Sequence, residues 1–225
     1  MDDPLSFLEF STQIVIPRLA LGMGITLKLT IVSAFFGMCI GLFLCLCRIS
    51  NSKALKALTV LYVTIFRGTP LLLQILFIYF ALPQVLDITL DSFPAGVLGL
   101  SLNCGAYFAE IFRSAIESIP KGQLEAARAL GLSYWQGMRR IIIPQTYKRL
   151  IPPVVNELAA LSKDTSLVSV IALGELLYMT QRLGAKYLRP WEVYFWAAIG
   201  YLMIVLALTI VSTYTERRLA RRGEI

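Results

Sequence analysis

The sequence contains no histidine, and only 16% of its 225 residues are charged. Histidine is the commonest metal ligand and the usual general base near neutral pH, so its absence removes many catalytic and metal sites. The sequence also lacks the phosphate loop G-x4-G-K-S/T of nucleotide hydrolases, and no nucleophile stands in a recognisable arrangement with a base. We therefore expect that the chain is not an enzyme, cannot hydrolyse ATP itself and holds no metal or cofactor.

Cysteine is also scarce, and its four positions carry no metal-site spacing. Cys39, Cys45, Cys47 and Cys104 all stand in apolar segments. We expect them to be reduced and buried, as small apolar side chains.

What the chain has in abundance is apolar residues, at 57% of the total. Soluble domains average about 45–50%, so long apolar runs with few charges predict an all-α integral membrane protein. We expect one transmembrane domain over residues 1–225, with five spans at about 19–47, 57–82, 93–118, 141–163 and 191–214. Residues 167–180 are expected to continue the fourth span, and residues 121–140 to form a cytoplasmic loop.

The fourth span needs a break, because the apolar character extends from residue 141 to residue 180. One helix of that length would reach ~60 Å, about twice the hydrocarbon core of a bilayer. Pro152-Pro153 is one candidate for the break, and residues 162–166 are the one we favour. Residues 181–190 are then expected to form an outer loop.

Lysine and arginine are unevenly distributed between the two sides of this arrangement. Fourteen of the 21 fall on one side, four on the other and three within the spans. The richer side is cytoplasmic by the positive-inside rule, which places the N-terminus outside and the C-terminus inside. This distribution also explains the net charge of +7 without nucleic acid. The cations of residues 181–190 run against the rule; they either face a partner protein or have no functional meaning.

Between the third and fourth predicted spans lies a segment with small residues and regular spacing. It reads Glu125-Ala126-Ala127, then Gly131 after three residues, then Pro144 after twelve more. Alanine favours helix and permits close approach, and glycine ends a helix where a left-handed residue is needed. Pro144 is expected where the chain turns back toward the membrane. The alternative interpretation is an ordinary amphipathic surface helix that ends at a glycine.

This spacing resembles the E-A-A-x3-G-x9-I-x-L-P loop of importer-type ABC transporter permeases, with Ile143 in place of the usual leucine. Residues 67–72 read R-G-T-P-L-L and resemble a signature of the polar amino acid permeases of the histidine/glutamine/arginine type. Residues 163–171 are similar to that family's K-D/E-S/T-S/A-L-V-S-V-I run. The resemblance covers roughly residues 20–215.

The resemblance implies a type I ABC importer permease fold in a bacterial cytoplasmic (inner) membrane. It implies a second permease copy, as a homodimer or a paralogous heterodimer. Separate ABC ATPase subunits would bind ATP and Mg and dock on the loop that carries Glu125, Ala126, Ala127, Gly131 and Pro144. An extracytoplasmic amino acid-binding protein would deliver the substrate, and membrane lipid would surround the chain.

Polar side chains inside the spans are candidates for substrate contact, because a charge at a helix centre costs ~2.5–3.5 kcal/mol on translocon scales. Asn103, Tyr107 and Glu110 share one face of the third span, and Asn156 and Glu157 lie on the fourth. We expect Asn103, Tyr107, Asn156 and Glu157 to bind substrate, with the Glu157 carboxylate pairing with a cationic group. The alternative for Asn103 and Glu157 is an interhelical hydrogen bond or buried pair. For Glu110 we favour a pair with Arg113.

A second group of residues is assigned to a gate or a structural role. Pro70 and Gly68 should bend or restart a helix, and Arg67 either binds lipid phosphate or holds a gate. Lys163 and Asp164 should stabilise the break after the fourth span.

The sequence thus predicts the permease subunit of an ATP-driven importer of polar amino acids. The alternatives are an ion-coupled carrier or channel, a structural membrane subunit, and an ABC permease for another substrate. The identity of the amino acid stays open.

Overall fold

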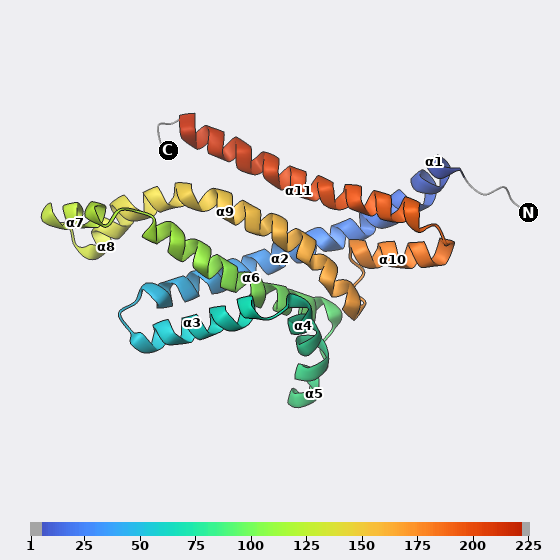
Figure 1. Ribbon diagram of the computed structural model, residues 1–225, viewed down its shortest axis with the longest axis horizontal. Coiled ribbons are helices and arrows are strands. Elements are labelled where there is room, and N and C mark those ends of the chain that lie inside the picture. The colour runs from blue at the N-terminus through green and yellow to red at the C-terminus, as the bar shows by residue number, and fades with distance from the viewer. Residues whose placement is uncertain (1–5, 222–225) are drawn as a thin grey trace, which may run out of the picture.

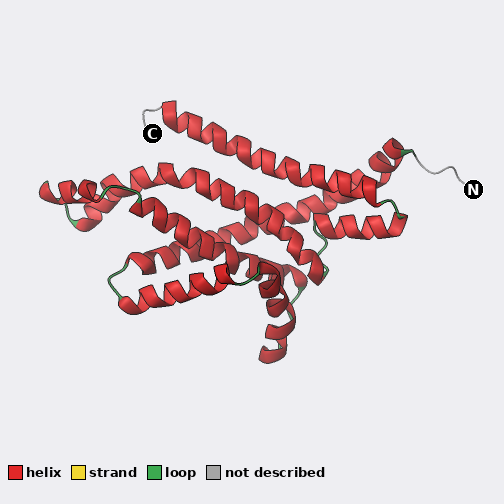
Figure 2. Ribbon diagram, in the orientation of Figure 1, coloured by secondary structure: helices red, strands yellow, loops and turns green. Residues whose placement is uncertain are grey.

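The computed structural model describes residues 6–221, with side chains described up to residue 215, and every regular element in this range is helical (Figures 1 and 2). Four long helices run roughly along the long axis of the molecule: α2 (Ile16–Ile49), α6 (Ser92–Glu117), α9 (Ile143–Asp164) and α11 (Pro190–Arg221). The short helices α7 (Lys121–Ala129) and α8 (Tyr134–Gly137) lie at one end. Helices α1 (Phe7–Phe10) and α10 (Leu176–Tyr187) lie at the other.

The first helix is longer than the sequence predicts. Helix α1 leads through a π-helical turn, Ser11–Val15, directly into α2, so helix extends from Phe7 to Ile49. Ser6 and Glu9 cap its start by a reciprocal pair of side-chain hydrogen bonds. Pro17 does not break the helix, because it stands in the first turn of α2, directly after the π-helical turn. The first turn is where a helix tolerates the absence of the N–H that proline lacks.

Helices α2 and α6 form the most extensive helix pair, and small residues line their contact. A Cβ atom added to Gly37 would lie 2.2 Å from the Cys104 sulfur, and one added to Gly41 would lie 2.5 Å from the Cβ of Phe108. Such close approach is typical of membrane helices that pack through small residues. Cys104 is buried in this contact as predicted, whereas Cys39 is exposed.

The second predicted span is interrupted where expected. Helix α3 (Lys53–Gly68) ends at the R-G-T-P motif, and α4 (Leu71–Leu76) begins after Pro70. A π-helical turn, Phe77–Ala81, joins α4 to α5 (Leu82–Leu86). The axes of α3 and of the segment from α4 to α5 differ by 102°, so this arm projects away from the long helices (Figure 1). Proline supplies no N–H and disfavours helix in the residue before it, which explains the break.

The segment after α7 is one long helical stretch. Helix α8, a π-helical turn (Met138–Ile142) and α9 follow one another without a gap. Helix continues through Pro152 and Pro153, so that pair is not the break. It changes to a 3-10 helix, Thr165–Ile171, within the window that we favoured for the break.

The outer loop predicted at residues 181–190 is wrong over most of its length, because α10 extends to Tyr187. The carboxylate of Glu175, which is fully buried, caps α10 by accepting hydrogen bonds from the backbone N–H groups of Leu177 and Tyr178, at 2.9 and 2.7 Å. It also accepts one from the Tyr201 hydroxyl at 2.8 Å. This cap and packing on α2 and α11 stabilise α10, whose residues 181–187 were expected to belong to a loop.

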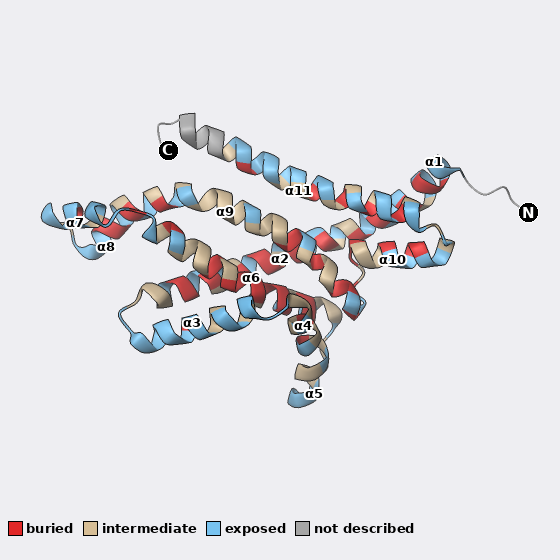
Figure 3. Ribbon diagram, in the orientation of Figure 1, coloured by how far each residue is buried: buried red, intermediate tan, exposed pale blue. Residues whose placement is uncertain are grey.

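Three helices in the described residues are long and apolar enough to cross a membrane, or four if α3 and the arm from α4 to α5 count as one broken span. Helix α9 covers the fourth predicted span but is not among them. Buried residues concentrate where α2, α6 and α9 cross, and the outer faces of the long helices expose apolar side chains (Figure 3). The count of five spans stays a prediction.

Candidate functional site

A pocket of about 370 Å³ lies where the interrupted helix meets α6 and α9. The break between α3 and α4 contributes Thr69, Pro70 and Leu71, and the remaining lining comes from Asn103 and Tyr107 on α6 and from Glu157, Ala160 and Asp164 on α9. Residues 157, 160 and 164 recur at helical spacing, so α9 presents them on one face. The 102° bend brings the R-G-T-P segment against the other two helices.

The pocket brings together most of the residues that were expected either to bind substrate or to form a gate. Asn103, Tyr107 and Glu157 were expected to bind substrate, whereas Pro70 and Asp164 were expected at a gate. The Arg67 guanidinium lies over the Tyr107 ring, 5.0 Å from its centre, and so stands beside the same pocket.

Besides Arg67, three of these selected residues lie outside the lining. Asn156 and Lys163 are exposed, because each stands one position along α9 from a lining carboxylate and therefore about 100° around the helix. Gly68 ends α3, and a Cβ added there would meet nothing within 4 Å. Close packing therefore does not explain the glycine.

The charges in the lining are both negative. Glu157 and Asp164 form no ion pair with any described residue, and their carboxyl groups stand one above the other on α9. Arg67, which lies over the ring of the lining residue Tyr107, is a cation at the edge of this pocket. A pocket with two unpaired carboxylates and one cation at its edge can hold a cationic or zwitterionic molecule.

Behind the pocket, the side chain of Gln74 closes the bend between α3 and α4. Its Nε2, which carries two hydrogens, lies within hydrogen-bond distance of three acceptors: the carbonyl of Phe66 at 2.9 Å, the carbonyl of Thr69 at 3.1 Å and the Thr69 hydroxyl oxygen at 2.8 Å. Its Oε1 accepts a hydrogen bond from Asn103 Nδ2 at 3.0 Å. Sequence analysis missed this residue, although an amide within the apolar run of α4 was a usable signal, because a buried polar group requires partners.

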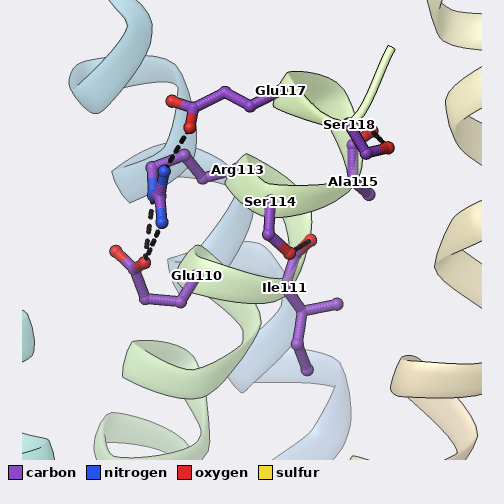
Figure 4. Close-up of polar contacts among 7 residues, drawn as sticks. All are labelled: Glu110, Ile111, Arg113, Ser114, Ala115, Glu117 and Ser118. Atoms are coloured by element: carbon purple, nitrogen blue, oxygen red, sulfur yellow. Dashed lines mark hydrogen bonds and ion pairs between the residues drawn. The ribbon is translucent and has the colours of Figure 1, made fainter.

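Glu110, the third polar residue on that face of α6, belongs to a separate cluster (Figure 4). Its carboxylate accepts hydrogen bonds from Arg113 Nε and Nη2 at 3.0 and 2.7 Å, and Arg113 also pairs with Glu117. Glu110 is absent from the pocket lining, and the pair with Arg113 that we favoured is present.

The E-A-A segment forms α7 and the turn after it. Glu125 and Ala126 are exposed, whereas Ala127 is buried against α8, next to Gly137. Gly131 has φ +84°, the left-handed conformation expected at the end of this helix. Its N–H donates to the Arg128 carbonyl at 3.0 Å, and the N–H of residue 132 donates to the Ala127 carbonyl at 3.1 Å. These two bonds make a Schellman motif, which fixes the corner between α7 and α8.

The turn expected at Pro144 is wrong. The chain reverses at residues 130–133, and Pro144 stands in the first turn of α9, inside the stretch that begins at Tyr134. The preceding π-helical turn, in which Ile143 N–H donates to the Met138 carbonyl, leads into the proline without a break. Pro144 is therefore exposed on a helix rather than at a bend.

Comparison with known proteins gives consistent matches along the chain. The arginine transport system permease protein ArtQ of Bacillus subtilis is 42% identical over 216 residues, which cover 94% of this chain and 97% of that protein. The glutamine transport system permease protein GlnP of Escherichia coli is 38% identical over 205 residues, 91% of this chain and 94% of that protein.

Solved structures agree with this result. The crystal structure of an amino acid ABC transporter with histidines matches with a TM-score of 0.89 and 34% identity, over 96% of this chain and all of that one. An inward-facing methionine ABC transporter, at 21% identity and a TM-score of 0.76 over 91% of this chain and 97% of that one, shares the fold. The fold is thus that of a type I ABC importer permease.

The sequence also matches, over residues 37–222, the family described as the binding-protein-dependent transport system inner membrane component. With its all-helical fold and its relatives among amino acid permeases, the chain belongs to this family of ABC transporter membrane subunits.

Proposed function

We propose that this chain is the permease subunit of an ATP-driven importer that carries polar amino acids across a bacterial cytoplasmic membrane. Separate ATPase subunits bind ATP and Mg, an extracytoplasmic binding protein delivers the substrate, and a second permease copy completes the path. Family membership supports the subunit assignment, and the names of the relatives, which include arginine, cystine and glutamine permeases, support the substrate class.

We propose five spans, with α9 as the fourth, and with the N-terminus outside and the C-terminus in the cytoplasm. The lysines and arginines support this orientation, because the richer side includes the corner of α7 and α8. Helix α1 and the end of α11 lie at opposite ends of the molecule, as an odd number of spans requires (Figure 1). Helix α9 is too polar for a lipid-facing span, which agrees with a position along a polar path.

The pocket between α3, α6 and α9 is the proposed substrate site. The observation that carries this assignment is the convergence of Asn103, Glu157 and Asp164 on one cavity with no ion pair to either carboxylate. Every free amino acid carries an ammonium group, and some carry a second cation, so a carboxylate-lined pocket suits them. Tyr107 lines this site and is proposed to contact substrate, and Arg67, which lies over the Tyr107 ring at the edge of the pocket, can serve as its gate.

The corner of α7 and α8 is the proposed contact for the ATPase. Glu125 and Ala126 are exposed there, and Gly131 fixes the turn behind them. Closure of the ATPase dimer would bring the two coupling helices of the permease pair together and open the path outward.

The test is ATP-dependent uptake of labelled amino acids by proteoliposomes that hold this chain with its ATPase and binding protein. Replacing Glu157 by glutamine removes one carboxylate, and a hydrogen bond to a charged group is worth about 1.5–3 kcal/mol. We expect uptake to fall about tenfold or more without loss of assembly. Asp91→Asn, the same acid-to-amide change on an exposed residue outside the pocket, serves as control.

Two results would contradict the proposal. Full uptake by the Glu157→Gln complex would reduce that residue to a packing role. Uptake driven by an ion gradient alone, with no ATPase present, would favour the secondary carrier.

A further inference from the structure

The amide of Asn103 has a defined orientation, and this orientation decides what it offers to the pocket. Its Nδ2 donates two hydrogen bonds, to the carbonyl of Phe66 and to Gln74 Oε1, both at 3.0 Å. An amide nitrogen carries two hydrogens, so both are used. The described residues supply no donor to Asn103 Oδ1, and Asn103 lines the pocket.

Backbone carbonyls determine which way both amides point. A carbonyl oxygen can only accept, so the group that faces the carbonyls of Phe66 and Thr69 must be a donor. If Gln74 were rotated by half a turn, its Oε1 would face both carbonyl oxygens, and its Nε2 would face the Asn103 nitrogen. If Asn103 alone were rotated, its Oδ1 would face the Phe66 carbonyl and Gln74 Oε1. Each alternative loses hydrogen bonds and brings like atoms together.

Gln74 orients the Asn103 amide from outside the pocket. It is absent from the lining that contains Asn103 and lines a neighbouring apolar cavity of about 450 Å³, which shares only Thr69 with that pocket. Its side chain therefore acts on a bound molecule through Asn103.

The result is a pocket wall made of hydrogen-bond acceptors. Asn103 turns Oδ1 toward the cavity, and Glu157 and Asp164 contribute carboxylate oxygens. A donor-rich cation such as an ammonium or guanidinium group matches a wall of acceptors. A neutral group of the same shape that carries a carbonyl oxygen leaves acceptors facing one another, a mismatch that is costly in a buried site.

We propose that Gln74 is a specificity-determining positioning residue, which holds the Asn103 amide so that the pocket selects a cationic, hydrogen-bond-donating group. This inference rests on the proposed function, since it assumes that substrate occupies this pocket. It assigns a role to a residue outside the pocket, and it names the chemical class that the membrane site prefers.

The test is equilibrium binding to the purified permease–ATPase complex in detergent, without the binding protein, whose own selectivity would otherwise dominate. Labelled arginine is the probe, and citrulline, its uncharged analogue, is the competitor. Gln74→Leu removes one of the two bonds that orient Asn103, and one such bond corresponds to about three- to tenfold in affinity. We expect the wild-type preference for arginine over citrulline to narrow by this factor in the variant.

Gln84→Leu is the matched control, because Gln84 is exposed on the same arm, in α5, and the same substitution there should leave the preference unchanged. The preference is a ratio measured on one preparation, so partial loss of folded protein does not alter it. If Gln74→Leu does not assemble, Gln74→Asn keeps the amide on a shorter side chain and should give a smaller narrowing.

The outcomes separate the two proposals. An unchanged preference in a Gln74 variant that still binds arginine overturns the role of Gln74 and leaves the substrate pocket standing. A wild-type complex that binds neither probe, or prefers citrulline, overturns the pocket assignment together with the inference built on it.

Discussion

Replacing Gly41 by alanine would place a methyl group inside the contact between α2 and α6. The added Cβ would lie 2.5 Å from the Cβ of Phe108, 2.9 Å from the backbone nitrogen of Ala109 and 3.0 Å from the carbonyl carbon of Phe108. Carbon atoms in contact prefer about 3.5–4.0 Å. Since two of the three atoms are backbone, no rotamer change relieves the overlap, and α6 must move by about 1 Å.

Overpacking of a well-packed site costs about 1–3 kcal/mol, and a clash with backbone belongs at the upper end of that range. Alanine also favours helix over glycine by about 0.5–1 kcal/mol, which obscures the clash when one variant is measured alone. Gly24→Ala provides the correction, because Gly24 lies on the same helix and a Cβ added there meets nothing within 4 Å. The difference between the two variants isolates the packing contribution, which we expect to be about 3 kcal/mol.

The measurement is the free energy of unfolding of both variants by SDS titration in mixed micelles. We expect Gly24→Ala to be at least as stable as the wild type and Gly41→Ala to unfold at lower SDS. If the two variants have equal stability, α2 and α6 do not approach each other as closely as described, and the reasoning fails.

Two further predictions concern the corner of α7 and α8 and the opposite end of the molecule. Gly131→Ala should strain a residue at φ +84° by about 1–2 kcal/mol and lower transport per ATP hydrolysed. Gly122→Ala, within α7 and in open space, should not, and equal coupling ratios of the two variants would contradict this. Tyr201→Phe should lower the free energy of unfolding by about 1.5–3 kcal/mol, because the buried Glu175 carboxylate loses a donor at 2.8 Å. Tyr194→Phe, at an exposed hydroxyl, is its control in the same SDS titration, and equal losses would argue against the Glu175 cap.

Features that depend on local chemistry could be predicted from the sequence. The R-G-T-P motif combines a glycine with a proline, so the break between α3 and α4 was expected. Gly131 adopts the left-handed conformation that its place after an alanine-rich helix indicated. The pocket was partly predictable for a similar reason. A carboxylate such as Glu157 within an apolar region needs a polar environment, so its presence alone indicates a site.

Features that depend on tertiary contacts could not be predicted in the same way. Gln74 and Asn103 are 29 positions apart, and only the 102° bend brings their amides together. Asn156 and Glu157 are adjacent in sequence, yet the helix turns one toward the pocket and the other away from it. Residues 181–187 were expected to form a loop, whereas they are the second half of α10, which the buried Glu175 caps.

The helical stretch from α8 to the end of α9 connects the corner to the pocket without a gap, so it can transmit a rotation at the corner as a lever arm does. Its 31 positions, from Tyr134 to Asp164, give a length of about 46 Å, with the corner at one end and the two pocket carboxylates toward the other. A tilt of about 5° around the α8 end would displace Glu157 by roughly 3 Å at the 1.5 Å rise of a helix. That displacement is about one hydrogen-bond length, so a small rotation at the corner is enough to make or release a contact in the pocket.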